Sequence, residues 1–179
     1  MLLRLAPHPD FPPGVDLRVE ARVLRSLNTL GVRYAVSGAI ATLTIPPIEA
    51  SARADELWRH TCFEAFFGGS GCETYYEFNF SPSTAWAAYR FDRYRAGMTN
   101  APISTPRINI VAAPASFELN VELNLGEIML PGDDWRLGLS AVLEESSGAK
   151  SYWALRHAAG KPDFHHRDAF AYEIAAAQT

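Results

Sequence analysis

The feature that most constrains this chain is a segment in which apolar and polar residues alternate without a break. From position 117 to 125, Phe, Leu, Val, Leu and Leu occupy the odd positions, while Glu, Asn, Glu and Asn occupy the even positions. Successive side chains of a strand point to opposite faces, whereas a helix would scatter these apolar residues around its axis. The segment therefore predicts a β-strand with one buried face.

The same period of two recurs along the chain and predicts further strands, at 19–23, 32–36, 60–67, 75–80, 108–110 and 137–143. Turn-forming residues separate these runs, among them Gly68–Gly71 and Pro131–Asp134. The apolar phase shifts after Gly38, which predicts a bulge there. Many short strands at such spacing predict an all-β fold, a two-sheet antiparallel β-sandwich. The length of 179 residues predicts a single domain spanning 1–179.

The charge distribution disfavours two classes of partner. The net charge is −4, and no window contains a run of Lys or Arg. Binding to nucleic acid needs a basic surface for the phosphates, and an anionic membrane attracts the same kind of surface. We therefore expect neither partner.

The apolar run at the start is soon broken by Pro7 and Pro9, which does not suit a signal peptide, so we expect a cytoplasmic protein.

Only two cysteines are present, Cys62 and Cys72. We expect Cys62 to lie within a strand and Cys72 close to the following turn, so that the two thiols do not face each other. A reducing compartment also disfavours a disulfide. Both thiols are therefore predicted to be free.

Three segments are richer in aromatic and polar residues than a plain sandwich requires. They read LWRHTCFEAFF (57–67), YYEFNFSPSTAWAAYRFDRYRAGM (75–98) and SYWALRHAAGKPDFHHRDAF (151–170). These strings resemble the bacterial DOMON-like proteins, relatives of the DOMON domains and of the family 9 carbohydrate-binding modules. The resemblance implies a sandwich of immunoglobulin-like or family 9 module-like type. It also implies a ligand site on or beside one sheet, which relatives use for sugars or for haem.

The predicted function is non-catalytic binding of a small polar ligand such as a carbohydrate. Short polar side chains on rigid strands suit sugar hydroxyls, and an exposed tryptophan offers a stacking surface for a sugar ring. Trp58 is the first choice for that surface and Trp153 the second. Arg90 is expected to pair with Glu77 or with a ligand carboxylate. The predicted ligand-binding residues are Trp58, His60, Glu64, Glu77, Asn79, Arg90 and His165.

Other functions are compatible with the same residues. Glu64 and Glu77 resemble the carboxylate pair of a glycoside hydrolase. A DOMON-type haem would need a methionine and a histidine, for which Met98 with His157 or His165 are the candidates, although no CxxCH motif is present. A protein-interaction module using an exposed sheet is a further alternative.

A metal site is not expected. His60 and Cys62 share one strand face, but side chains two residues apart on a strand are about 7 Å apart, which is awkward for shared ligation. Neither a metal ligand nor a catalytic residue is therefore predicted. The loop containing His165 and His166 is an alternative location for the site, since polar clusters in loops often carry function.

Overall fold

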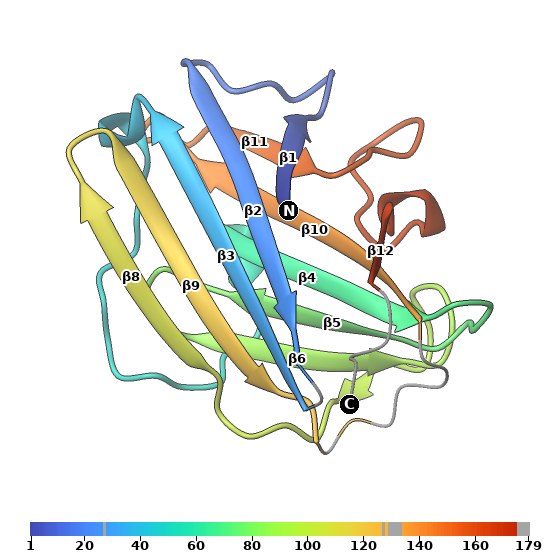
Figure 1. The fold of residues 1–179 in the computed structure, drawn as a ribbon. Coiled ribbons are helices and arrows are strands. Elements are labelled where there is room, and N and C mark those ends of the chain that lie inside the picture. The colour runs from blue at the N-terminus through green and yellow to red at the C-terminus, as the bar shows by residue number, and fades with distance from the viewer. Residues whose placement is uncertain (27, 127, 129–133, 175–179) are drawn as a thin grey trace.

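The computed structural model describes residues 1–26, 28–126, 128 and 134–174, and antiparallel strands dominate it (Figure 1). Its strands are β1 (Leu2–Pro7), β2 (Leu17–Arg25), β3 (Thr29–Gly38), β4 (Cys62–Gly69), β5 (Tyr75–Phe80), β6 (Trp86–Phe91), β7 (Thr99–Asn100), β8 (Arg107–Ala113), β9 (Ser116–Asn124), β10 (Trp135–Glu144), β11 (Lys150–Ala154) and β12 (Tyr172–Ile174). Three short 3-10 turns, η1 (Ile40–Thr42), η2 (Leu57–Arg59) and η3 (Arg167–Ala169), are the only helical elements in these ranges. Within the described residue ranges, no helix is long and apolar enough to cross a membrane.

The strands form two layers that face each other (Figure 1). Sheet A has the order β1-β2-β3-β9-β8, and sheet B has the order β7-β6-β5-β4-β10-β11, with β12 beside the first residues of β10. β1 pairs with β2 through Leu2–Leu5 and with β11 through Ala6 and Pro7, so it connects the two sheets. All these pairings are antiparallel, and the predicted sandwich is confirmed.

The core between the sheets follows from the alternation in the sequence. Phe117, Leu119, Val121 and Leu123 of β9 are at most 4% exposed and face inward. From sheet B, Phe67 and Phe78 stack with ring centroids 4.7 Å apart. Burying one apolar side chain of this size contributes roughly 1.5–3 kcal/mol to the free energy of folding. One face of each sheet is therefore fixed by the hydrophobic effect.

Two local expectations need correction or qualification. Gly38 does not form a bulge but ends β3, at φ +111°, where an added Cβ would lie 2.3 Å from the carbonyl oxygen of Asp16. The later apolar residue Leu43 forms only an isolated bridge with Glu145, because the chain turns through η1 first. The turn predicted at 131–134 lies outside the described residues except for Asp134.

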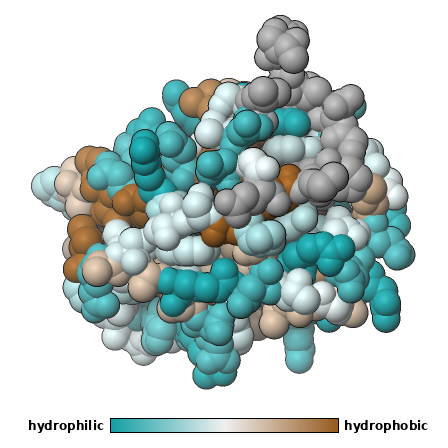
Figure 2. Space-filling model, turned by 90° about the horizontal axis from the view of Figure 1, so that it is seen from below, coloured by the Kyte–Doolittle hydropathy of each residue, from teal (hydrophilic) through white to brown (hydrophobic). Residues whose placement is uncertain are grey.

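The outer face of sheet B is also largely buried. A second apolar cluster lies on this face, formed by Phe66, Tyr75, Ala87, Tyr89, Phe91 and Phe170, with Leu57 and Phe164 packed against it. Elsewhere, as the view from below in Figure 2 shows, apolar residues form small separate groups among hydrophilic ones. A sheet face buried under loops is therefore the unusual feature of this sandwich.

Candidate functional site

The outer face of sheet B forms the floor of a cavity of about 840 Å³. Strand β4 turns Glu64 to this face and Phe63 to the core, and β5 does the same with Glu77 and Phe78. Most of the cavity wall comes from segments outside the sheet, with Asn100 of the edge strand β7 added. The wall residues are Phe11, Asp55, Glu56, Trp58, Arg95, Met98, Asn100, Lys161, Pro162, Phe164 and His165. A volume of this size suits a small ligand.

Glu64 lies on this floor and is only 3% exposed. Its Oε2 accepts a hydrogen bond from Oγ of Ser140, at 3.2 Å, from the neighbouring strand β10. The backbone carbonyl of Glu64 accepts a hydrogen bond of 2.6 Å from the hydroxyl of Tyr34, which crosses from sheet A. The position of Glu64 is thus fixed from both layers of the sandwich.

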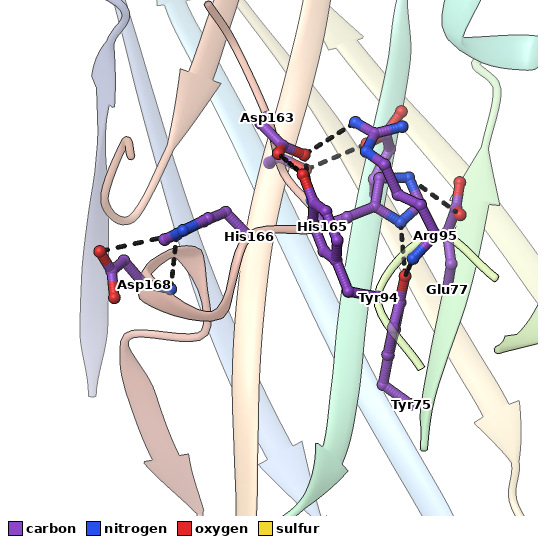
Figure 3. A network of polar contacts seen from close by, with 10 residues as sticks. Tyr75, Glu77, Tyr94, Arg95, Asp163, His165, His166 and Asp168 are labelled. Carbon is purple, nitrogen blue, oxygen red and sulfur yellow. Dashed lines mark hydrogen bonds and ion pairs between the residues drawn. The ribbon is translucent and has the colours of Figure 1, made fainter. Parts of the chain in front are cut away.

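Glu77, from the adjacent strand β5, is 6% exposed and belongs to a polar network (Figure 3). Its Oε1 accepts a hydrogen bond of 2.7 Å from Nδ2 of Asn79, and its Oε2 lies 3.6 Å from Nε2 of His165. Nδ1 of His165 lies 2.9 Å from the hydroxyl of Tyr75, which accepts a bond from the backbone N–H of Arg95. The hydroxyl of Tyr75 and Nδ1 of His165 therefore share one hydrogen bond, and Nε2 of His165 faces Glu77.

The loop that carries His165 is anchored by Asp163 (Figure 3). This carboxylate accepts hydrogen bonds from the hydroxyl of Tyr94 at 2.5 Å, from Nη2 of Arg95 at 2.7 Å and from the backbone N–H of His165 at 3.1 Å. Burial acts to raise the pKa of Asp163, but the bonds from Tyr94 and Arg95 outweigh it and lower that pKa. Asp163 is therefore an ionised anchor rather than a group free to meet a ligand.

Burial sets the ionisation of the floor. It raises the pKa of Glu64 to about 8, helped by the nearby charge of Glu77. Burial likewise raises the pKa of Glu77. It lowers the pKa of His165 to about 4, together with the positive charge of Arg95. His165 is therefore neutral at pH 7, and its contact with Glu77 is not an ion pair, although the geometry alone would permit one.

Aromatic side chains line the cavity above this floor. Trp58, from η2, is 49% exposed, and Phe91, Tyr152 and Phe164 also line the cavity. Tyr89 of β6 turns its hydroxyl to Asp55 and donates a hydrogen bond of 2.5 Å to Oδ1. Aromatic walls over a polar floor are the combination found in many small-molecule sites.

The structure brings together four of the residues predicted from sequence. Trp58, Glu64, Glu77 and His165 all line the cavity. Asn79 lies on the same floor, is 1% exposed, and contributes by holding Glu77.

The other two are placed elsewhere, so the expectation that they converge with this group is corrected. His60 lies before β4 begins, and its mostly exposed side chain pairs with Glu144, with Nδ1 and Oε2 2.7 Å apart. Arg90 lies on the same face of β6 as Trp86 and Ala88, which is the face turned to the core. Its guanidinium forms an ion pair with Asp92, at 2.5 Å, and not with Glu77. Trp153, the second choice for a stacking surface, is 3% exposed in the core.

Several lining or supporting residues were missed. Ser140 follows from the alternation of 137–143, but only the pairing of β10 with β4 shows that it faces Glu64. Tyr89 could have been found from the phase of β6, because a core tryptophan at 86 turns positions 87, 89 and 91 outward. Asp55 and Arg95 come from irregular segments for which no periodicity gives a direction.

The cysteines differ in environment. Cys62 is buried on β4, and Cys72 is exposed in the β4–β5 connection; both thiols are free. Burial raises the pKa of Cys62, so its thiol remains protonated. Among the described residues, no group of three or more His, Cys, Asp or Glu side chains is arranged to hold a metal ion.

Comparison with protein-family models and with curated protein sequences gives no match. Solved structures do match over nearly the whole chain. A candidate carbohydrate-binding protein from Bacteroides uniformis aligns with a TM-score of 0.70 and 15% identity, covering 98% of this chain and 85% of the other. A family 9 carbohydrate-binding module from Caldicellulosiruptor kristjanssonii, in complex with glucose, aligns with a TM-score of 0.56 and 11% identity, covering 99% and 86%. The same module in complex with cellotriose aligns equally well, with 12% identity. The chain therefore shares its fold with carbohydrate-binding modules.

Proposed function

We propose that this chain is a non-catalytic binding domain whose cavity on sheet B takes a small carbohydrate. The observation that carries the proposal is that two buried carboxyl groups and a half-exposed tryptophan line the same cavity. Sugar rings present hydroxyls for such polar groups and apolar faces for an aromatic ring. The fold shared with modules crystallised with glucose and cellotriose supports this ligand class. The DOMON-like resemblance and the cytoplasmic location remain predictions.

A ligand screen tests this proposal. We would measure the melting temperature of the full chain with a panel of mono- and oligosaccharides that includes glucose and cellotriose, and then measure affinities for the hits by calorimetry. A ligand at 100 times its Kd stabilises a protein by about 2.7 kcal/mol, which such a screen detects. No stabilisation by any carbohydrate would contradict the proposal.

Two variants locate the binding. Trp58→Ala and Glu77→Gln should weaken a carbohydrate hit at least tenfold, which is about 1.4 kcal/mol. The matched controls are Leu24→Ala, at an apolar position that is 77% exposed, and Glu122→Gln, at an exposed glutamate on β9. Both controls lie on sheet A and should leave the affinity unchanged. If the site variants and the controls changed the affinity equally, the carbohydrate would bind outside this cavity.

Glycoside hydrolysis is supported less well by the same residues. Such an enzyme needs one protonated and one ionised carboxyl group. Burial raises the pKa of both Glu64 and Glu77, so their environments shift the two groups in the same direction instead of pushing their pKa values apart. We therefore propose binding without turnover, and incubation with chromogenic glycosides should release no product above that of Glu64→Gln.

A haem does not fit these contacts well. Met98 and His165 both line the cavity. However, Nδ1 of His165 is bonded to Tyr75 and Nε2 faces Glu77, so neither nitrogen is free for iron. His157 uses Nε2 to contact the carbonyl of Ala6 and does not line the cavity. Protein purified with added haem is therefore expected to show no Soret band.

A further inference from the structure

One of the two carboxyl groups on the floor of the cavity, that of Glu64, has an oxygen without a hydrogen-bond partner among the described residues. Glu64 accepts one hydrogen bond, at Oε2, and within the described part of the chain its Oε1 has no hydrogen-bond partner. A carboxylate accepts up to about four hydrogen bonds, and leaving this capacity unused on burial is unfavourable. Because Glu64 is 97% buried yet lines the cavity, its unpaired oxygen is directed at the ligand space.

In the described ranges, neither Glu64 nor Glu77 forms an ion pair with a lysine or arginine side chain, and Arg95 acts on both only through its nearby charge. The nearest guanidinium, that of Arg95, is bonded to Asp163 at 2.7 Å. A third acidic side chain, Asp55, lies at the wall beside Tyr89. Acidic side chains in the cavity lining therefore outnumber the basic ones, which are Arg95 and Lys161.

The walls suit a positively charged group. Trp58 and Phe164 line the cavity from outside the sheet, and Tyr89, Phe91 and Tyr152 line it from sheet B, the sheet that carries the carboxyl groups. The faces of aromatic rings attract cations, and the attraction is stronger where water is excluded. Carboxyl groups below and aromatic rings around form the environment that binds an ammonium group.

We propose that the ligand of this cavity carries a protonated amine, as an amino sugar does, and that its ammonium group binds against Glu64 and Glu77. The inference rests on the proposed carbohydrate function and narrows its ligand class. A neutral sugar offers hydrogen bonds to the floor and leaves Glu64 in its neutral form. An ammonium group supplies three donors and a positive charge that stabilises the ionised form of both carboxyl groups.

Binding of an amine is then coupled to a proton. In the free protein Glu64 is neutral at pH 6, since its pKa is about 8. The bound ammonium favours the carboxylate, so Glu64 loses its proton to solvent while the amine keeps all of its own. The other titratable or charged groups around this pair are Tyr34, Cys62, Tyr75, Tyr89, Arg95 and His165, together with Asp55, Glu56, Tyr152 and Lys161 of the cavity lining. His165 is already neutral at pH 6, since its pKa is about 4, so it is not the source of the released proton.

Calorimetry at pH 6 with four ligands tests the proposal. Glucosamine carries the amine on a sugar ring, glucose lacks it, N-acetylglucosamine has it neutralised, and choline has a cation without a sugar. We expect glucosamine to bind at least ten times more tightly than glucose or N-acetylglucosamine. Repeating the titration in buffers of different ionisation enthalpy should show release of up to one proton for glucosamine and none for glucose.

Variants separate a lost site from a lost fold. Glu64→Gln should reduce the preference for glucosamine over glucose to less than threefold and abolish the proton release, with the melting temperature of the wild type or above. Glu77→Gln provides an independent second carboxyl deletion. Should Glu64→Gln fail to fold, the loss of preference in Glu77→Gln decides the test.

Each outcome is distinct. Equal binding of glucose and glucosamine overturns the amine proposal and leaves the carbohydrate function intact. Binding of choline as tight as that of glucosamine supports the cation site but contradicts the sugar function. No binding of any of the four overturns the amine proposal, and the wider carbohydrate screen then decides the proposed function separately.

Discussion

Nε2 of His165 lies 3.6 Å from Oε2 of Glu77, although Glu77 belongs to β5 and His165 to the loop before η3 (Figure 3). The contact joins a loop close to the C-terminal strand to the floor of the sheet. It also places a histidine with a lowered pKa beside a glutamate with a raised pKa. The ionisation of the site and the docking of the loop are therefore linked.

Stability should fall between pH 6.5 and 8. Glu64 has a pKa of about 8 in place of the usual 4.5, so the folded chain holds this proton more tightly, and the resulting stabilisation is lost as the pH rises through that range. His165, at about 4 in place of 6.5, acts in the opposite direction, but only below pH 6.5. Above pH 6.5 only the glutamate contribution remains, with a limiting slope of about 1.4 kcal/mol per pH unit for each group.

Denaturant unfolding at pH 6.5 and pH 8 measures this effect. Glu64→Gln should flatten the dependence, whereas Glu122→Gln, at an exposed glutamate of sheet A, should keep the wild-type slope. A wild-type protein equally stable at the two pH values would show that Glu64 is not held neutral by its burial.

Trp58 should dominate the quenching of tryptophan fluorescence. It is 49% exposed, whereas Trp86, Trp135 and Trp153 are 3–6% exposed. Acrylamide should therefore quench one component efficiently, and Trp58→Phe should remove that component. A bound ligand should protect it. Unchanged quenching in the presence of a saturating hit would mean that the ligand does not cover Trp58.

The two thiols should react at very different rates. Cys72 is exposed, while Cys62 is fully buried with a raised pKa, and only the thiolate is reactive. A thiol reagent applied to the native chain should label Cys72 alone, and labelling of Cys62 should require denaturation. Peptide mass spectrometry without reduction identifies the labelled site. A linked Cys62–Cys72 peptide would contradict the prediction.

Tyr34→Phe should destabilise the fold by about 1–3 kcal/mol, because the buried carbonyl of Glu64 loses the hydrogen bond that it accepts across the sandwich. The ring itself is fully buried and keeps its packing against Phe63. Tyr152→Phe, at a half-buried tyrosine of β11, is the control and should change the free energy of unfolding by less than about 0.5 kcal/mol. A silent Tyr34→Phe would mean that water replaces the hydroxyl.

The fold was largely predictable because its strands carry one clear signal. In β9, every second residue is apolar and buried, so the period of two identified both the strand and its inner face. β4 and β5 are buried on both faces, yet Glu64, Glu77 and Asn79 stood out as polar residues within aromatic segments. Such residues are costly to bury and so indicate a site or a network.

The remainder of the site depends on contacts that the sequence does not encode locally. That Ser140 faces Glu64 depends on β10 lying beside β4, a pairing between strands far apart in the chain. Arg90 was assigned to the polar face because it is charged, but the phase of its strand turns it inward at an edge where it still reaches solvent. The cavity walls come from irregular segments, whose directions are set only by tertiary packing.

The double role of β1 has a consequence for the order in which the protein assembles. During synthesis, β1 and β2 form a local pair, and β3, β9 and β8 complete sheet A once position 124 has left the ribosome. In sheet B, β1 can pair with β11 only after β11 has been synthesised, and β4 can pair with β10 only after residues 135–144 have been synthesised. Until then, one edge of β4 has no partner strand. A nascent chain stalled before β10 therefore presents an unpaired, aromatic-rich strand edge, the kind that chaperones protect from association with other chains.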